Sequence, residues 1–450
     1  MDVETIELKD ASGFPGTAER LLTPASLEEL AGILKEARAG RVPVTILGSR
    51  TGITGGSMPR SGWAVSMEKF RRLEIGEGRA RCGAAVTLNE IAAEAGKTNQ
   101  FYAPDPTEWT ASVGGTINTN ASGSRSFKYG STRNHVLGLL VAHIDGTVRE
   151  YKRGEPIDFD VPELPLPATT KCTAGYQLKP GMDWVDLFCG SEGTLGVVVE
   201  ADLKLLKKPK SLLAGVVFFP TMDQGFDAVD AWRGVAGLRM LEFIDFNTLD
   251  LMRPSYPEIP AEAKSALMIE SEHPDADAWV DRLEAAGALL EASWFGETDR
   301  DRERFRVFRH GAPERVNETV LRRGFLKLGS DFAVPVTRTR EMADYYYSVL
   351  KERWPGQYVI YGHVGDGHLH VNLMPASAEE NRLGNEIMKD WARQAVALGG
   401  TVSAEHGLGK RKSHFLRLQY SSDQIEAMKQ VKRRLDPDWL LGNGNLFPED

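Results

Sequence analysis

Polar and apolar residues alternate strictly along one short stretch late in the chain, from His368 to Leu373. As a strand, this stretch would place His368, His370 and Asn372 on one face and its Leu and Val residues on the other. The apolar face would enter a core, and the polar face would line a cleft. A Gly-Asp-Gly turn precedes it at residues 365–367. We therefore predict a strand that presents imidazoles to a cleft.

Helical periodicity appears first near the N-terminus. Leu27, Leu30 and Leu34 recur at helical spacing, after a capping-box pattern that begins at Ser26 and before a stop at Gly40. A short apolar strand at 43–47 follows and runs into a glycine-rich loop.

Between about residues 207 and 395 the two periodicities alternate, which predicts a second, α+β domain with an antiparallel sheet. The basic run at 207–210 is the expected crossing point, and two helices with a Gly- and Asn-rich loop are expected beyond residue 382. The amphipathic stretches are 276–292, 299–308 and 338–354, and the strand-like runs are 212–219, 266–270 and 358–361.

Length and composition allow two or three domains, since 450 residues with 42% hydrophobic content can form large cores. The formal charge of −9 disfavours a nucleic-acid-binding or anionic-membrane surface. Three scattered cysteines indicate a reducing compartment. No leader pattern and no apolar run of about 20 residues appears. We expect a cytoplasmic protein, and contact with a membrane through a partner stays open.

Three loops rich in Gly, Ser and Thr adjoin strand-like runs, at 48–56, 104–132 and 188–199. Glycine lets successive backbone N–H groups converge on an anion. The first loop lacks the Gly-Lys-Ser/Thr of a phosphate-binding Walker loop, and a strand follows it, not the helix of a dinucleotide fingerprint. Three such loops predict a large ligand with many polar atoms.

Four of the nine histidines lie either in 363–370 or in the Ala-Glu-His-Gly segment 404–407. Imidazole with carboxylate suits zinc, or manganese if water completes the coordination. The alternative is a set of hydrogen-bonded structural histidines beside a tight turn. Their clustering favours a metal site.

In combination, the motifs resemble the FAD-linked oxidoreductases of the vanillyl-alcohol-oxidase (PCMH) type. The resemblance is to the branch with D-lactate dehydrogenases, D-2-hydroxyglutarate dehydrogenase and the glycolate oxidase flavoprotein subunit, and it covers nearly the whole chain. The motifs are Gly48-Ser-Arg-Thr-Gly-Ile-Thr-Gly-Gly56, Pro104-Asp-Pro-Thr107 with Val113-Gly-Gly115, Asn120-Ala-Ser-Gly123, Gly190-Ser-Glu-Gly-Thr-Leu-Gly-Val197, His363-Val-Gly-Asp-Gly-His-Leu-His370 and Ala404-Glu-His-Gly407.

This resemblance implies an α+β fold with a PCMH-type FAD-binding domain of two α+β lobes (1–207), an α+β cap domain (208–395) and a C-terminal helical segment that packs back (396–450). FAD is expected to be non-covalent, because the first glycine loop has no His or Cys for a covalent link. The implied FAD contacts are Gly48, Ser49, Arg50, Thr51, Gly52, Thr54, Gly55, Gly56, Pro104, Asp105, Thr107, Val113, Gly114, Gly115, Asn120, Ser122, Gly123, Glu192, Gly193, Gly196, Val197 and Asn445.

The resemblance further implies a divalent metal on His363, His370 and Glu405. Asn372 and His406 would face the substrate, and Arg309 and Lys327 would bind its carboxylate. His368 stands where many members of the branch have Asn, which leaves open whether it also binds the metal. The terminal Gly-Asn-Gly-Asn at 442–445 replaces the usual Asn-Pro-Gly-Lys, so a lysine contact is expected to be missing there.

The implied reaction is oxidation of a D-2-hydroxy acid (lactate, glycolate or 2-hydroxyglutarate) by hydride transfer to flavin N5, with His406 as base. The electron acceptor would be a quinone, a cytochrome, an electron-transfer flavoprotein or an iron–sulfur subunit, and a homodimer is expected. Alternatives are a non-redox FAD transferase of this fold, an electron-relay subunit, and a zinc hydrolase, which would leave the glycine loops unexplained.

Overall fold

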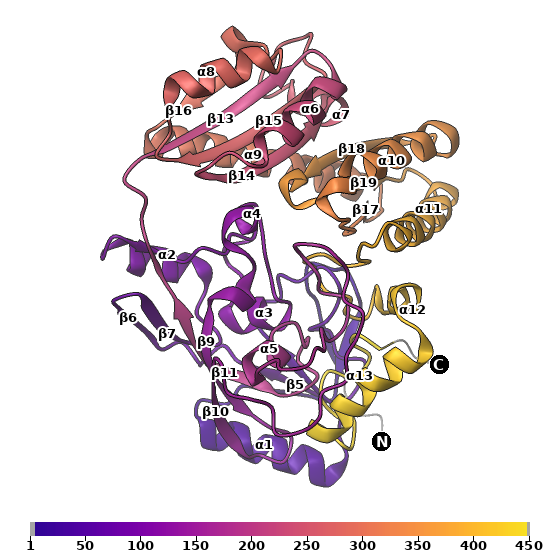
Figure 1. Ribbon diagram of the computed structural model, residues 1–450. Helices are drawn as coiled ribbons and strands as arrows, with labels where there is room; N and C mark the ends of the chain where they lie inside the picture. The colour runs from indigo at the N-terminus through magenta and orange to yellow at the C-terminus, as the bar shows by residue number, and fades with distance from the viewer. Residues whose placement is uncertain (1–4, 448–450) are drawn as a thin grey trace.

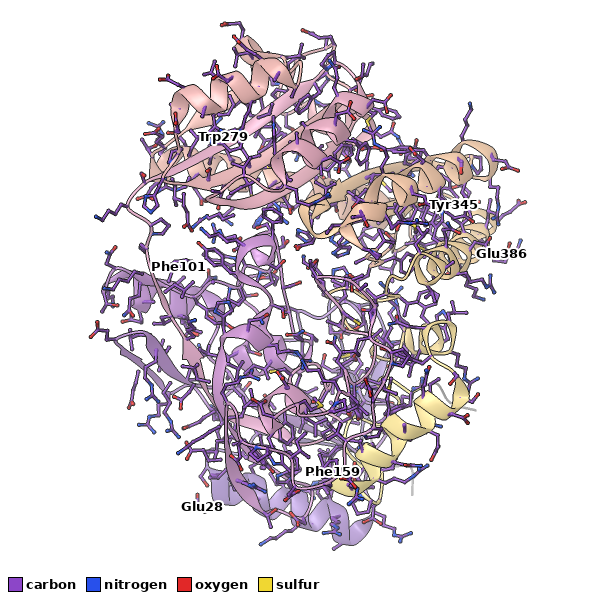
Figure 2. The ribbon with its side chains drawn as sticks, in the orientation of Figure 1. Glu28, Phe101, Phe159, Trp279, Tyr345 and Glu386 are labelled. Atoms are coloured by element: carbon purple, nitrogen blue, oxygen red, sulfur yellow. The ribbon has the colours of Figure 1, made fainter. Side chains whose placement is uncertain are left out.

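The computed structural model describes residues 5–447. Figure 1 shows the first two hundred residues in the lower part of the molecule and the strands β13–β19 in the upper part, with the C-terminal helices returning to the lower part. Strand β12 leads from one part to the other and reaches β13 within five residues. Phe101, labelled in Figure 2, lies close to this junction, where the guanidinium of Arg239 sits 6.0 Å above its ring.

The lower part contains a parallel three-stranded sheet and an antiparallel five-stranded sheet, with orders β3-β5-β4 and β10-β9-β11-β7-β6. Two short pairs, β1–β2 and β8–β12, complete it. The strands are β1 (Ile6–Leu8), β2 (Gly16–Ala18), β3 (Arg20–Leu22), β4 (Val44–Leu47), β5 (Trp63–Ser66), β6 (Leu73–Gly76), β7 (Arg79–Gly83), β8 (Gln100–Phe101), β9 (Val136–Ala142), β10 (Val148–Lys152), β11 (Val197–Lys204) and β12 (Leu206–Lys207).

Helix α1 (Leu27–Gly40) begins as predicted, with the Ser26 side chain accepting from the Glu29 amide. The carboxylate of Glu29 accepts from the Ala25 amide, so the reciprocal bond of the capping box to Ser26 is displaced by one residue. The other helices that precede residue 207 are short. They are α2 (Leu88–Gly96), α3 (Val113–Asn118), α4 (Ser126–Tyr129) and α5 (Trp184–Phe188).

The upper part is built on one seven-stranded antiparallel sheet in the order β16-β13-β15-β14-β18-β19-β17, which confirms the predicted antiparallel sheet. Its strands are β13 (Leu212–Phe219), β14 (Leu238–Asp245), β15 (Ser265–Glu272), β16 (Trp294–Gly296), β17 (Leu328–Gly329), β18 (Gln357–Gly362) and β19 (His370–Met374). The helices are α6 (Met222–Trp232), α7 (Phe246–Met252), α8 (Ala276–Ala285), α9 (Asp299–Arg322), α10 (Thr339–Arg353) and α11 (Ala378–Ala397).

Two helix predictions had wrong ends. The stretch 276–292 is helical only to Ala285, before a turn at Gly287 with positive φ. The stretch 299–308 continues to Arg322 and accommodates Pro313 inside the helix. Strand β14 was missed because all eight of its residues are buried, including Arg239 and Glu242, so it shows no alternation.

The predicted histidine strand begins two residues later than expected, at His370. The chain leaves a short 3-10 helix, Val364–Asp366, through Gly367, whose φ of 68° is left-handed. His368 therefore lies before the strand, and its prediction as a residue of the strand face was wrong. Its ring nevertheless packs against that of His370, with centroids 4.3 Å apart.

The C-terminal residues pack back onto the lower part. After α12 (Leu416–Gln419) and α13 (Ser422–Leu435), Leu441 forms a bridge with Val44 of β4, and the Gly442 amide donates to the Val44 carbonyl at 2.9 Å. The division at residues 207 and 395 stays a prediction. Of residues 5–447, no helix is long and apolar enough to cross a bilayer.

Candidate functional site

A cavity of about 840 Å³ is lined by both parts of the molecule. The three glycine-rich loops contribute residues from one side, and the histidines with their neighbouring carboxylates contribute from the other. Segments more than three hundred positions apart in the sequence therefore line one cavity. Fifteen of the predicted cofactor residues line it: Gly48, Ser49, Arg50, Thr51, Gly52, Thr54, Gly56, Thr107, Gly114, Gly115, Ser122, Gly123, Glu192, Gly193 and Asn445.

The glycine loops present bare backbone to this cavity. At Gly52 and Gly193, an added Cβ atom would meet no protein atom within 4 Å, so both positions face open space. At Gly48 the Ser112 hydroxyl would lie only 2.6 Å from such an atom. Exposed backbone N–H groups around an open space fit the polar atoms of a dinucleotide.

The remaining predicted cofactor residues lie behind the cavity wall. Asp105 accepts hydrogen bonds from Trp109 and Ser124, and the Asn120 side chain accepts from the Arg133 amide. Their surroundings give them supporting contacts within the protein. The other residues that do not line the cavity are Gly55, Pro104, Val113, Gly196 and Val197.

Glu192 ties the third glycine loop to the C-terminal segment. Its carboxylate accepts from the amides of Leu408 and Gly409, each at 2.7 Å. Burial raises the pKa of Glu192 to about 7, although these two amides oppose that shift. Asn445 donates to the Glu192 carbonyl at 3.0 Å. These hydrogen bonds join the third glycine loop to the C-terminal segment along one side of the cavity.

Sequence reasoning missed Lys410. Its ammonium donates to the Asn445 side chain at 2.7 Å and lies 3.4 Å from the Gly56 carbonyl. A lysine thus reaches the terminal Asn from another segment, where the altered end motif had suggested none. Burial lowers the pKa of Lys410 to about 7.

The metal-ligand candidates converge on one carboxylate oxygen. The Oε1 atom of Glu405 lies 3.1 Å from His363 Nε2 and 3.2 Å from His370 Nε2. Donor atoms of two overlapping sets lie within 4.8 Å of one another: His363, His368, His370 and Glu405 in one, and Asp331, His370, Glu405 and His406 in the other. The structure therefore brings all three predicted ligands together.

Several buried polar atoms around this cluster lack hydrogen-bond partners. Nδ1 of His368 and Nδ2 of Asn372 are among them, whereas Nε2 of His368 and Nδ1 of His406 lie 3.3 and 3.4 Å from the Asp331 carboxylate. Burying such atoms unpaired is costly, which is the condition that a bound ion or substrate would relieve. The donor set and these atoms fit a divalent cation.

The second oxygen of Glu405 is held by residues that sequence reasoning missed. The Lys171 ammonium donates to Oε2 at 3.0 Å, and the Ser122 hydroxyl donates to it at 2.8 Å. Burial would raise the pKa of Glu405, but His363 and Lys171 lower it well below its usual value. These contacts leave Oε1 as the oxygen that faces the histidines. Lys171 follows two threonines in a stretch without periodicity, so no sequence signal marks it.

Glu242 holds His363 in place in the same way that Lys171 and Ser122 hold Glu405. Its carboxylate lies 2.6 Å from His363 Nδ1 and accepts from Arg309 at 2.8 Å. Burial opposes ionisation, but Arg309 and His363 hold the pKa of Glu242 well below its usual value. A carboxylate on the outer nitrogen orients the other nitrogen of a metal-binding imidazole. No pattern revealed Glu242, because β14 shows no alternation.

Asp331 holds His406 in place through both its backbone and its ring. Its carboxylate accepts from the His406 amide at 3.0 Å and lies 3.4 Å from His406 Nδ1. Burial lowers the pKa of His406 to about 4, and Asp331 opposes this shift. The rings of His406 and His370 are stacked, with centroids 5.3 Å apart.

The two predicted carboxylate-binding residues both line the cavity but differ in their surroundings. Two of the guanidinium nitrogens of Arg309, Nε and Nη2, each lie 2.8 Å from the Glu242 carboxylate. The third, Nη1, lies 3.3 Å from the Thr107 hydroxyl. Burial, followed by the nearby Lys412, lowers the pKa of Lys327 to about 8. Asn372 lies beside them on β19, buried.

Comparison with known families matches both parts of the chain. The family described as "FAD linked oxidases, C-terminal domain" matches residues 208–446, and the family "FAD binding domain" matches residues 18–152. The first match alone spans more than half of the chain. The chain belongs to the FAD-linked oxidases. It is an FAD-linked oxidoreductase with the fold that the sequence motifs implied.

Similar proteins cover nearly the same length. The glycolate oxidase subunit GlcD of Bacillus subtilis is 29% identical over 97% of this chain and 90% of its own. The D-lactate dehydrogenase of Archaeoglobus fulgidus is 29% identical, over 96% and 92%. The D-2-hydroxyglutarate dehydrogenase of Xanthomonas citri is 27% identical, over 94% and 88%.

Among solved structures, an alkyldihydroxyacetonephosphate synthase matches with a TM-score of 0.67. The sequences are 15% identical, and the match covers 96% of this chain and 77% of that one. At this identity the likeness shows the shared fold alone.

Proposed function

We propose that this oxidoreductase converts a D-2-hydroxy acid into the 2-oxo acid, with FAD as electron acceptor and a divalent metal beside the substrate. The observation that carries the proposal is the single cavity, in which the glycine loops meet the cluster of His363, His370 and Glu405. The names of the relatives support it, since they concern glycolate, D-lactate and D-2-hydroxyglutarate.

The cofactor would rest on the backbone of the three glycine loops. Ser49, Thr51 and Thr54 offer hydroxyls between the glycines, and Gly52 and Gly193 leave room for a ligand. FAD, when bound, supplies the acceptor for a hydride. The loops' own part is to place that ligand against the histidine cluster and to exclude water.

His363, His370 and Glu405 would hold the metal, zinc or manganese by donor type. Lys171 and Ser122 keep Oε2 of Glu405 turned away, and Glu242 keeps Nε2 of His363 turned inward. When bound, a divalent metal lowers the pKa of a substrate hydroxyl as a Lewis acid. His368 stays a candidate fourth ligand.

His406 would remove the hydroxyl proton. Its side chain is one quarter exposed, stacks on the His370 ring and is anchored through its amide to Asp331. Nδ1 faces the Asp331 carboxylate at 3.4 Å, which would orient the ring. An imidazole that a carboxylate orients beside the metal site is a suitable general base.

Lys327 and Nη1 of Arg309, the guanidinium nitrogen that is not on Glu242, would bind the substrate carboxylate by charge-assisted hydrogen bonds. Asn372, with an unpaired Nδ2, would complete the substrate contacts. The electron acceptor, a quinone, cytochrome, electron-transfer flavoprotein or iron–sulfur subunit, would meet the protein after flavin reduction. GlcD is named as a subunit, which supports a partner of this kind. A homodimer stays a prediction.

Anaerobic titration tests the proposal. The purified protein should be yellow, contain stoichiometric metal, and lose flavin absorbance with a D-2-hydroxy acid but not with its L-enantiomer. A non-redox transferase of this fold would keep its absorbance with every hydroxy acid. That outcome would refute oxidation and favour the transferase alternative.

A further inference from the structure

His370, one of the metal-ligand candidates, stands at one end of a row of side chains that crosses the seven-stranded sheet. His370 on β19 pairs with Tyr361 on β18, and Tyr361 pairs with Ile244 on β14. Glu242 lies two residues before Ile244 on β14 and pairs with Met268 on β15. Directly opposed residues, and residues two apart on a strand, share a face. The row therefore runs on one face from β19 to β15.

The far end of this row is apolar and enclosed. Helices α7 and α9 cover this face of the sheet and add Met252, Phe308 and Ala312. Together with Ile244, Met268 and Tyr361 they line the same cavity as the histidines, although five of these six residues are less than 10% exposed. Methionines adapt to irregular apolar groups, so this pocket suits a hydrocarbon of variable shape. We use "apolar pocket" for these six residues.

Charge is segregated across the histidine cluster. Lys327 adjoins β17, which pairs with β19 on the side away from β18 and β14. In the described residues, Arg309 is the one basic side chain that α7, α9, β14 or β15 contributes to the cavity wall, and Glu242 already neutralises it. With Arg309 shared between Glu242 and the first carboxylate, a second carboxylate in the apolar pocket would meet no further basic side chain from these elements.

From this arrangement we infer that the apolar pocket binds the side chain of the substrate, which is a branched aliphatic or aromatic group. The inference rests on the proposed function, because it places the α-carbon at His370 and the carboxylate toward Lys327. The side chain of a D-2-hydroxy acid then extends past Tyr361 toward Met268. The preferred substrate is an apolar 2-hydroxy acid, and short or dicarboxylic acids are poorer ones.

A substrate series tests this assignment in the holoenzyme. Anaerobic flavin reduction is measured with glycolate, D-lactate, D-2-hydroxyisocaproate, D-3-phenyllactate and D-2-hydroxyglutarate. Filling a hydrophobic pocket with one further methylene changes kcat/KM by about 10- to 200-fold. The larger apolar acids should therefore exceed D-lactate by at least roughly tenfold.

Two variants locate the pocket. Ala312→Phe fills it and should lower the ratio of D-2-hydroxyisocaproate to D-lactate turnover by about tenfold or more. Met268→Gln, of nearly the same volume, introduces an amide and should lower the same ratio. Val307→Phe is the matched control, since it enlarges an exposed residue of the same helix that does not line the cavity. If Ala312→Phe loses its flavin, Met268→Gln decides.

The outcomes separate the two levels of the argument. If glycolate, D-lactate or D-2-hydroxyglutarate reduces the flavin fastest, the apolar pocket assignment falls and the proposed oxidation stands. If an apolar acid is fastest and neither Ala312→Phe nor Met268→Gln alters the ratio, the pocket has been placed wrongly. If no hydroxy acid reduces the flavin, the proposed function itself fails.

Discussion

The two sides of the cavity are built from different chemical material. The glycine loops offer backbone N–H groups and short hydroxyls, whereas the opposite side offers imidazole and carboxylate side chains that other charged side chains hold in place. Backbone groups recognise a ligand by shape and position, so each residue of the glycine loops contributes only a small part of the binding. The histidine cluster concentrates its chemistry in a few atoms. Single substitutions should therefore affect the two sides very differently.

We call the two sides of the cavity the backbone wall (the glycine loops) and the side-chain wall (the histidine cluster with its carboxylates). The largest effect is expected from a substitution in the side-chain wall. His370→Ala removes one of three metal-ligand candidates, and loss of the metal should lower flavin reduction by about a thousandfold or more. FAD content should not change, because the glycine loops are untouched. Metal analysis and the visible spectrum measure both. Unchanged stoichiometric metal in this variant would refute the ligand assignment.

Next in size is His406→Ala. Removing a general base lowers turnover by about 10²- to 10⁴-fold, while metal and flavin should both remain. His273→Ala, at an exposed position that does not line the cavity, serves as the control. Retained activity in His406→Ala would remove this residue from the base role.

A smaller effect is expected from Lys171→Met, which removes one of the two donors to Oε2 of Glu405 and leaves Ser122. Substitution of a residue that orients a metal ligand costs about 10- to 100-fold in metal affinity or activity. The exposed Lys179→Met is the matched control. An unchanged metal affinity for Lys171→Met, measured by competition with a chelator, would show that Glu405 needs no anchor.

On the backbone wall, a single residue should matter least. Gly52→Leu projects a side chain into open space at the cavity and should weaken FAD binding by about tenfold, the effect of overpacking by 1–3 kcal/mol. Gly32→Leu introduces the same group where nothing lies within 4 Å, on the surface helix α1. Equal FAD affinity in both variants would mean that Gly52 does not adjoin the cofactor.

The same contrast explains what the sequence could predict. The glycine loops and the histidine motif are local patterns, so their residues and the family could be read directly. The residues that orient the histidines and Glu405 could not, because Lys171, Glu242 and Asp331 act across 75 to 234 positions and lie in stretches without periodicity. The prediction for His368 was wrong for another reason: Gly367 has a left-handed backbone conformation, and the strand begins two residues after His368.

Metal removal tests most directly whether the two walls act as separate parts of one site. The holoenzyme is stripped with a chelator, its FAD content is measured, and a D-2-hydroxy acid is added without oxygen before and after zinc or manganese is restored. We predict that FAD stays bound, that the flavin of the stripped protein is no longer reduced, and that the metal restores reduction. Undiminished flavin reduction in metal-free protein would contradict the role assigned to His363, His370 and Glu405.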